Sequence, residues 1–324
     1  MTALAPLPLV GPRRLVYLAT PEIAVAPLEA LVEAGFDVAL VVTTVDKRRG
    51  RGSAVAPSPV KAAAERLSLR VSHRVEDALD VDADLGVVVA FGQLIRPPVL
   101  VRLPMVNLHF SLLPRWRGAA PVERAILAGD AVTGVCLMQV DVGLDTGPVI
   151  DVVETPIGSG ETAVALRRRL ALLGMDLLVR NLTAGLGPAV AQIGEASHAA
   201  KISGADRAIV WHDSAESIGR LVRVGGAWTT FRGKRLKVLE AIVTEHAGPV
   251  GTFIDTTIVA TGEAAVRLVT VQPEGKAAMD AAVWAIGARP QTGERIGAAT
   301  ATSTEMSFGA TSGESTGGAV GTTP

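Results

Sequence analysis

Three short, nearly continuous apolar runs constrain the fold of this 324-residue chain more than any other feature. They span Leu15 to Ala19, Val38 to Val42 and Leu85 to Ala90, and they are rich in valine. Such runs are typical of strands buried on both faces of a parallel sheet. Helical patterns lie between them, at Pro21 to Ala34 and Pro59 to Leu67. Alternating strands and helices predict an α/β fold with a Rossmann-like doubly wound sheet.

The same alternation continues to about residue 185. A chain of 324 residues is long enough for two domains of about 100 to 200 residues each. We therefore assign residues 1–185 to a first domain and residues 186–206, which are rich in Gly and Ala, to a linker. The further elements expected in the first domain are strands at Val106 to His109, Val132 to Val140 and Val149 to Thr155, and helices at Ala120 to Ala128 and Glu161 to Leu182.

Residues 207–290 show a different pattern, in which short apolar segments alternate with turn residues. Their spacing predicts a small, OB-like β-barrel. Residues 291–324 contain almost no large apolar side chain, so they cannot bury enough surface to offset ordering, and we predict a disordered tail. The expected barrel strands are Trp228 to Phe231, Leu236 to Glu240, Gly251 to Val259 and Val266 to Val271.

Composition and charge narrow the class of protein. The net charge is -1, so any contact with nucleic acid must use a local basic patch. Cys136 is the only cysteine, which excludes an intrachain disulfide and a metal site with several thiolates. No apolar run reaches the roughly 18 residues that span a bilayer, and no secretory signal is recognisable. We expect a monomeric cytoplasmic protein without a metal or a membrane partner.

Two polar residues lie where the fourth expected strand ends. Asn107 and His109 are two positions apart, so in a strand their side chains point to the same face. Ligands of parallel sheets bind at the carboxyl ends of the strands. There an amide and an imidazole could hold a developing oxyanion, and the imidazole could move a proton near neutral pH. From spacing alone, the alternative is a structural pair with satisfied hydrogen bonds.

A turn rich in Gly and Asp, residues 141–147, separates the next two expected strands. The carboxylate of Asp145 could reach the same edge of the sheet, where it could orient the imidazole or take a proton through water. Asp is also a common turn former, so the alternative role of Asp145 is to cap this turn.

Read together, the two segments resemble the folate-dependent formyltransferases. The shared pattern is Asn107-x-His109-x-Ser111-Leu112-Leu113-Pro114, with Asp145 further along the chain. The resemblance implies that Asn107, His109 and Asp145 are catalytic and that the formyl donor is 10-formyltetrahydrofolate. It also implies a folate cleft beside the end of the third strand, whereas without it that segment reads as a strand end and its turn. The residues expected to line the cleft are Phe91, Gly92, Gln93, Leu94, Ile95, Ser111, Leu112, Leu113 and Pro114.

Within that superfamily the chain is most similar to the branch that acts on tRNA. Residues 115–121, Arg-Trp-Arg-Gly-Ala-Ala-Pro, look like that branch's version of the loop after the shared motif. Residues 46–61 resemble the insertion loop with which that branch engages the acceptor end of the tRNA. Basic residues in such a loop suit phosphate contacts, whereas charge alone favours a solvated basic loop. The loop residues expected to bind tRNA are Arg48, Arg49 and Arg51.

The second domain contains another basic segment. Between Arg220 and Lys237 there are six basic residues and no acidic one, with Trp228 and Phe231 among them. Basic and aromatic residues on a small barrel suit an RNA surface, and a solvated face over two core aromatics is the alternative. The residues expected to contact tRNA here are Arg232, Lys234 and Arg235.

A few positions depart from the family pattern. Ala19 and Ile23 stand where the family usually has Gly and Phe. A methyl group at position 19 would narrow the folate cleft if the backbone there needs close approach. Residues 224–228 replace the Asn-Pro-Trp-Pro stretch that often follows the helix of the second domain.

The resemblance implies transfer of the formyl group of 10-formyltetrahydrofolate to the free amino group of charged methionyl initiator tRNA, for translation initiation. The alternatives are a formyltransferase that acts on an amino sugar nucleotide or another small amine, and a folate- or RNA-binding module without turnover. A nicotinamide-dependent dehydrogenase is disfavoured, because Ala19-Thr20-Pro21 stands where Gly-x-Gly-x-x-Gly would follow the first strand.

Overall fold

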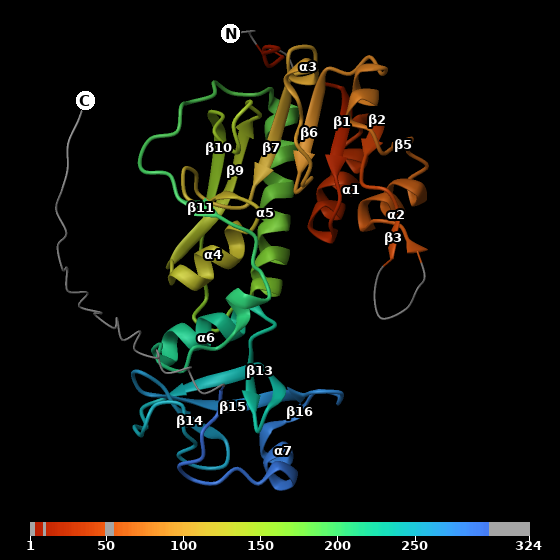
Figure 1. The fold of residues 1–324 in the computed structure, drawn as a ribbon. Coiled ribbons are helices and arrows are strands. Elements are labelled where there is room, and N and C mark those ends of the chain that lie inside the picture. The colour runs from red at the N-terminus through yellow and green to blue at the C-terminus, as the bar shows by residue number, and fades with distance from the viewer. Residues whose placement is uncertain (1–3, 9–10, 49–54, 298–324) are drawn as a thin grey trace, which may run out of the picture.

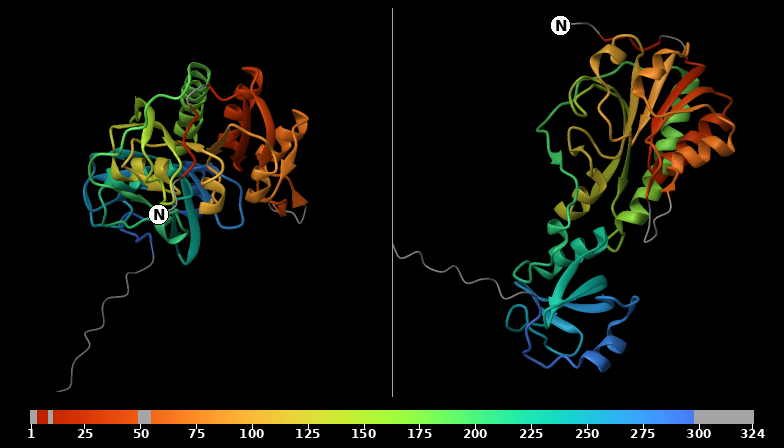
Figure 2. Two further views of the ribbon diagram at one scale, coloured as in Figure 1. Left: turned by 90° about the horizontal axis from the view of Figure 1, so that it is seen from above. Right: turned by 45° about the vertical axis from the view of Figure 1, so that its right-hand side comes forward.

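The chain forms two domains stacked end to end (Figures 1 and 2). The structure is a computed structural model that describes residues 4–8, 11–48 and 55–297. A seven-stranded sheet is the centre of the first domain, and a five-stranded antiparallel sheet is the centre of the second. The predicted fold class is confirmed.

The first sheet has the strand order β10-β9-β7-β6-β1-β2-β5. β1 pairs in parallel with β2 and β6, and the parallel pairing continues to β5 on one side and β7 on the other. β9 is antiparallel to both β7 and β10. The strands are β1 (Arg14–Ala19), β2 (Asp37–Val42), β5 (Val71–Ser72), β6 (Leu85–Val89), β7 (Met105–His109), β9 (Val132–Gln139) and β10 (Val149–Pro156).

The direction in which strands are added reverses between β1 and β6. After β1 the chain adds β2 and β5 on one side, and it then returns to place β6 and β7 on the other. Ligands of open α/β sheets bind outside the carboxyl ends of the strands at such a reversal. The carboxyl ends of β1, β6 and β7 are therefore the first place to look for a site.

Helices cover both faces of this sheet. One face packs against α1, α2, α4 and the 22-residue α5, which runs behind the strands in Figure 1. The other face packs against α3 and the 3-10 helix η2. Because side chains alternate along a strand, Leu15 and Tyr17 belong to the first core and Val16 and Leu18 to the second. The helices are η1 (Glu22–Ala24), α1 (Val25–Glu33), α2 (Pro59–Arg66), η2 (Val75–Leu79), α3 (Pro97–Leu100), α4 (Pro121–Ala128) and α5 (Ala163–Ala184).

The side chain of Ala19 lies in the first of these cores. Ala19 is fully buried together with Leu15, Tyr17 and Leu28, and Ile23 packs against the same group. The methyl group thus fills space between sheet and helices. This placement argues against the expected narrowing of a folate site by Ala19.

The expected linker is folded onto the first domain for part of its length. Strand β11 (His198–Ala199) pairs in parallel with β8 (Arg117–Gly118), and Val190 exchanges backbone hydrogen bonds with Val149. The segment between the domains is therefore attached beside the loop that follows β7.

The second domain packs an antiparallel sheet against α6 and α7. Its core contains Phe231, Phe253 and Trp284, and Phe231 lies edge-on to each of the other rings at centroid distances of 5.6 and 5.3 Å. The elements are η3 (Ala205–Arg207), α6 (Ala215–Val224), β12 (Trp228–Phe231), β13 (Lys234–Thr244), β14 (Ile258–Ala260), β15 (Ala265–Pro273), β16 (Met279–Asp280) and α7 (Ala281–Ala288). The short hairpin β3 (Lys47–Arg48) and β4 (Val55–Ala56) belongs to the first domain.

The strand expected over Gly251 to Val259 was wrong for most of its length. Only Ile258 to Ala260 form a strand, whereas Thr252 and Phe253 make isolated bridges. The carboxylate of Asp255 accepts backbone hydrogen bonds from Thr257 and Ile258 at 2.6 and 2.7 Å. This local turn uses donors that a strand would need for its ladder.

The predicted tail begins too early. Residues 291–297 are ordered and return to the second domain, where Ile296 is only 4% exposed within the core. The backbone of Phe253 donates to the carbonyl of Glu294 at 2.9 Å, and the Glu294 carboxylate pairs with Arg232 at 2.6 Å. A single large apolar residue in a Gly-rich stretch was too weak a signal. Residues 298–324 lie outside the described residues.

Helix α6 connects the two domains. It packs against α4 and α5, and Val224 at its end belongs to the core of the first domain while Ile218 and Val222 belong to that of the second. The guanidinium of Arg223 donates to the carbonyl of Glu161 at 3.1 Å. Among the described residues, no helix is long and apolar enough to cross a membrane.

Replacing Ile296 with alanine should destabilise the second domain. Removing a buried Ile side chain typically costs about 2 to 5 kcal/mol of unfolding free energy. The matched control is Ile286→Ala, because Ile286 is 75% exposed and such substitutions usually stay within about 0.5 kcal/mol. Equal stability of the two variants in a denaturant titration would contradict a second domain that extends to residue 297.

Cys136 should resist thiol reagents in the folded chain. It is 2% exposed on β9, and burial raises the pKa of its thiol from 9.0 to about 11. The thiolate is the reactive form, so labelling should be slow at pH 8 and fast once guanidinium unfolds the chain. Because the folded-state pKa is the higher one, the group's contribution to stability is complete below pH 9.0 and is lost as the pH rises to about 11. Rapid stoichiometric labelling of the native chain at pH 7 would contradict this burial.

Candidate active site

Asn107 and His109 lie at the carboxyl end of β7, on the sheet face opposite α5. Val106 and Leu108 belong to the core under α5, so the two polar side chains point the other way. His109 is buried at 5% exposure, and Asn107 is half-buried. The structure therefore brings both predicted residues to one face, as their spacing predicts.

A backbone carbonyl fixes the ring of His109. Its Nε2 lies 2.7 Å from the carbonyl oxygen of Trp116, which can only accept, so Nε2 carries a proton and donates it. The other ring nitrogen, Nδ1, remains for a different partner. The loop after β7 folds back over the strand to make this contact.

Two side chains hold Trp116 in place. The backbone N–H of Trp116 donates to the hydroxyl of Ser111 at 3.0 Å. The carboxylate of Asp130 accepts from the Trp116 indole at 2.8 Å and from the Arg115 guanidinium at 2.7 and 3.1 Å. The Arg115 guanidinium also stacks over the Trp116 ring. The orientation of His109 thus depends on Asp130, 21 positions away in sequence.

Asp145 faces His109 from the turn between β9 and β10. Its Oδ2 lies 3.7 Å from Nδ1 of His109, which is too long for a direct hydrogen bond and close enough for strong attraction to an imidazolium. The same oxygen accepts the backbone N–H of Gly118 at 2.8 Å. Asp145 has a φ of +51°, a conformation that Asp tolerates better than most residues. The structure therefore places Asp145 opposite His109, and Asn107 lies two residues before His109 on the same strand.

The segment after β6 that is expected to line the folate cleft, residues 91–95, has two buried ends and an exposed middle, called the tip below. Phe91 and Ile95 are buried in the core on the α3 side, whereas Gln93 and Leu94 are exposed. Gly92 has a φ of +71°, which glycine adopts without strain. The side chains of Phe91 and Ile95 are therefore committed to the core, and the backbone and tip of this segment remain free to contact a ligand.

The second expected folate segment, residues 111–114, mainly shapes the loop. The Ser111 hydroxyl is used by both backbone groups of Trp116. Leu112 packs over Gly134, where an added Cβ would lie 2.5 Å from the Leu112 methyl group. Leu113 is half-buried, and the carbonyl of Pro114 accepts the backbone N–H of Ser197 at 3.2 Å.

Of the basic loop residues, Arg48 is exposed on β3, while Arg49 and Arg51 lie outside the described residues. The base of the hairpin is well anchored. The buried hydroxyls of Thr43 and Ser58 are 2.8 Å apart, and the Lys61 ammonium pairs with the Asp46 carboxylate at 2.8 Å.

In the second domain, Arg232 has a structural role. It sits in the two-residue turn between β12 and β13 with a φ of +47°, and its guanidinium donates to Glu294 and to the carbonyls of Ala288 and Arg289. The Arg232 guanidinium is thus held within the second domain, and its expected contact with tRNA stays a prediction.

Other cations of this segment are accessible. Lys234 is exposed, and Arg235 is exposed and stacks over the Trp228 ring with its guanidinium carbon 4.2 Å from the ring centroid. Beside them is a surface hollow of about 430 Å³ lined by Arg235, Lys237, Gln272, Pro273, Glu274, Gly275, Lys276 and Ala277.

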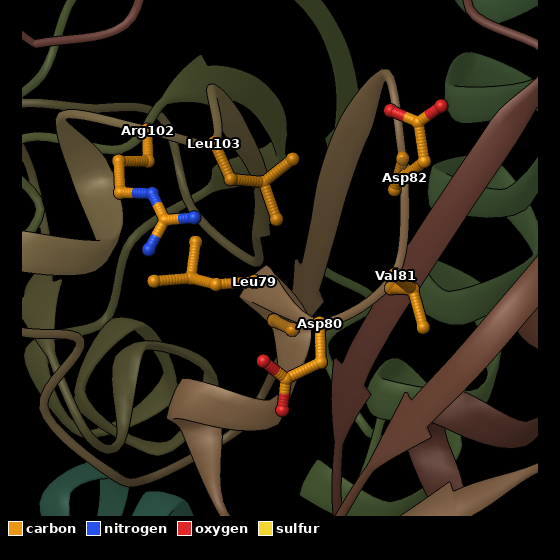
Figure 3. Close-up of a pocket in the computed structure, with 8 residues that line it drawn as sticks. Leu79, Asp80, Val81, Asp82, Arg102 and Leu103 are labelled. Carbon is orange, nitrogen blue, oxygen red and sulfur yellow. The ribbon is translucent and has the colours of Figure 1, made fainter.

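A second hollow lies at the opposite edge of the first sheet. Its volume is about 360 Å³, and it is lined by residues 78–83 together with Arg102 and Leu103 (Figure 3). These segments precede β6 and β7, so the hollow is at the amino ends of the strands. Nothing there connects it with His109, which lies at the carboxyl end of β7.

Sequence reasoning missed the residues that position the site. Asp130 contacts Trp116, whose carbonyl bonds His109, and Gln192 contacts the carbonyl of Asp145. Each of the two stands alone in an unremarkable stretch of sequence. No local spacing connects them with the catalytic motif, so only the folded chain shows their contacts.

Comparison with known protein families matches both domains. The model described as formyl transferase matches residues 13–182, and the model described as formyl transferase, C-terminal domain, matches residues 201–289.

Curated relatives are similar over most of the chain. A methionyl-tRNA formyltransferase of Jannaschia sp. is 42% identical over 293 residues, covering 85% of this chain and 97% of the relative. Those of Ruegeria pomeroyi and Clavibacter sepedonicus are 40% and 43% identical, covering 87% and 84% of this chain and 100% and 96% of the relatives.

Solved structures share the fold at low sequence identity. An N-formyltransferase from Helicobacter canadensis, in complex with folinic acid and dTDP-3-aminofucose, superimposes with a TM-score of 0.61 at 18% identity, covering 79% of this chain and 98% of that one. HypX from Aquifex aeolicus, in complex with tetrahydrofolic acid, gives a TM-score of 0.59 at 18% identity, covering 85% of this chain and 47% of that one. From the matches of both family models and the curated relatives that align over nearly their whole length, the chain belongs to the formyl transferase family, in the group of methionyl-tRNA formyltransferases.

Proposed function

We propose that the chain transfers the formyl group of 10-formyltetrahydrofolate to the amino group of methionyl initiator tRNA. The observation that carries this proposal is the 3.7 Å approach of Asp145 to His109, with Asn107 on the same strand as His109, in a chain whose relatives at about 40% identity are methionyl-tRNA formyltransferases. The two-domain relatives support the tRNA substrate, because they align over almost their full length.

The reaction needs an electrophile, a proton acceptor and a place for negative charge. The amino nitrogen attacks the formyl carbon and forms the new C–N bond, and the bond from that carbon to N10 of the folate then breaks. The attacking nitrogen loses one proton and the leaving N10 gains one. In the tetrahedral intermediate the formyl oxygen bears the charge, and the half-buried Asn107 amide is a suitable donor for it.

The contacts of His109 decide which ring nitrogen takes part. Nε2 is occupied by the Trp116 carbonyl, so Nδ1 is the nitrogen that can exchange a proton or donate to the oxyanion. Asp145 lies 3.7 Å from Nδ1, where its charge stabilises an imidazolium that forms during the reaction. We assign proton transfer to the His109–Asp145 pair, directly or through a water molecule.

The folate is expected beside the strand reversal. The exposed tip formed by Gly92, Gln93 and Leu94 borders this region at the end of β6, and Thr20 at the end of β1 makes a long, 3.5 Å hydrogen bond to the Phe91 carbonyl. Structural neighbours in complex with folinic acid or tetrahydrofolic acid support a folate donor for this fold. The backbone of the tip is the part suited to hold the pteridine.

For the tRNA we propose two basic surfaces. One is the hairpin that carries Arg48, and the other is the hollow with Arg235, Lys237 and Lys276. In Figure 1, β3 of the hairpin and β16, which follows the hollow, both lie on the right-hand side of the molecule. Stacked Arg235 and Trp228 add an aromatic platform of the kind that RNA surfaces use.

The direct test of the proposed function is transfer of labelled formyl from 10-formyltetrahydrofolate to methionyl initiator tRNA. Uncharged tRNA and a free amino sugar nucleotide are the control acceptors. Formylation of the charged tRNA alone supports the proposal. Transfer only to the sugar nucleotide would replace it with the small-amine alternative, and folate binding without any transfer would replace it with a binding module.

Substituting Asn107 with alanine should reduce turnover by about 100- to 1,000-fold, because one oxyanion donor is lost. Folate affinity and thermal stability should change little, since the side chain is only half-buried. Single-turnover formyl transfer and folate titration measure the two effects. A variant with near-normal turnover would exclude Asn107 from the mechanism.

Substituting Arg235 and Lys237 with alanine should raise the KM for tRNA and leave turnover at saturation unchanged. The slope of log KM against log salt concentration should also fall by about 0.7 to 0.9 for each phosphate contact that is lost. The matched control is Arg102→Ala, which removes an exposed charge at the opposite edge of the first domain. Unchanged salt dependence in the double variant would move the tRNA surface elsewhere.

A further inference from the structure

The segment between the two domains reaches the candidate active site. Residues 183–200 lie between the ranges matched by the two family models. Within that segment β11 pairs with Arg117 and Gly118, and Val190 pairs with Val149. Gln192 lies between these two attachments, at the point where the segment passes the Asp145 turn.

The side chain of Gln192 connects the loop after β7 with the turn between β9 and β10. Its amide nitrogen donates to the carbonyls of Asp145 and Gly147, both at 2.8 Å. Its amide oxygen accepts two hydrogen bonds from the guanidinium of Arg117, at 3.0 and 2.6 Å. Both hydrogens of the Gln192 amide and its oxygen are thus engaged, by Asp145 and Gly147 on one side and by Arg117 on the other.

Gln192, Arg117, Gly118 and Asp145 form a closed ring of contacts, called the Asp145 hydrogen-bond ring below. Arg117 is followed by Gly118, whose backbone N–H donates to Oδ2 of Asp145, the oxygen nearest His109. Gln192 connects Arg117 back to the carbonyl of Asp145. The carboxylate and the carbonyl of Asp145 are therefore held from opposite sides. A residue at positive φ in a turn with two glycines needs such external anchors to keep one conformation.

We propose that Gln192 is a positioning residue that sets the distance between the Asp145 carboxylate and Nδ1 of His109. Gln192 does not touch the reacting atoms and acts through Asp145 and Gly118. The inference rests on the proposed function, because it assumes that Asp145 takes part in formyl transfer. It adds to that function a dependence of catalysis on the segment that leads to the second domain.

The decisive variants are Gln192→Leu and Gln192→Glu. Leucine removes all four hydrogen bonds, whereas glutamate keeps an acceptor for Arg117 and loses the donors to the Asp145 and Gly147 carbonyls. Both variants should lower kcat by about 10- to 100-fold, as small displacements of a catalytic group do, with KM for each substrate changed less than about threefold. The matched control is Ile193→Ala, because the neighbouring side chain is 86% exposed.

Hydrogen exchange provides a readout without turnover. If Gln192 stabilises the Asp145 hydrogen-bond ring, the backbone amide of Gly118 should exchange faster in both Gln192 variants and at the normal rate in Ile193→Ala. A purely structural role would instead lower the melting temperature and raise exchange throughout the first domain. Unchanged Gly118 exchange, or wild-type kcat in Gln192→Glu, would overturn the proposal.

A double-mutant cycle separates this proposal from the proposed function. If Gln192 acts through Asp145, Gln192→Leu should lower kcat little further in an Asp145→Ala background. Fully additive losses would overturn the positioning role while leaving Asp145 catalytic. Normal turnover of Asp145→Ala itself would instead overturn the assignment of Asp145 and, with it, the present inference.

Discussion

The hydrogen bond from Nε2 of His109 to the carbonyl of Trp116 determines most of the candidate active site. It requires the loop after β7 to turn back on the strand, and Ser111 and Asp130 hold the loop in that position. It also leaves Nδ1 as the only ring nitrogen that can face Asp145. One backbone carbonyl thereby selects the tautomer, the ring orientation and the partner of the imidazole.

The sheet supplies the rigid part of this arrangement. β7 lies between β6 and β9, and Gly174 of α5 lets the helix approach closely, with Val135, Leu108 and Phe110 within 3.6 Å of where a Cβ would be. The side chains proposed for the chemistry are then carried by β7 and by a short loop whose ends are fixed by strands. A site built in this way can hold its groups to within a fraction of an ångström.

The sequence was most informative where burial imposes a period. The valine-rich runs predicted β1, β2 and β6, and the two-residue spacing of Asn107 and His109 predicted their common face. It was least informative where contacts join distant residues. Arg232 reads as a surface cation but is bound by Glu294, which lies in a segment whose composition predicts disorder. Gln192 and Asp130 have no local pattern at all, because their partners are 45 or more and 14 or more positions away, respectively.

The division into a catalytic domain, a linker and a second domain is therefore incomplete as a physical description. The match to the first family model ends at residue 182, and the match to the second begins at residue 201. The segment between them contributes Gln192 and the strand that pairs with Gly118. From there the chain continues directly into η3 and α6, and α6 has side chains in both hydrophobic cores. The same segment donates to the carbonyl of Asp145 through Gln192 and pairs with Gly118, whose N–H donates to the Asp145 carboxylate. The proposed tRNA surface of the second domain and the proposed catalytic pair of the first are thus connected by one stretch of backbone.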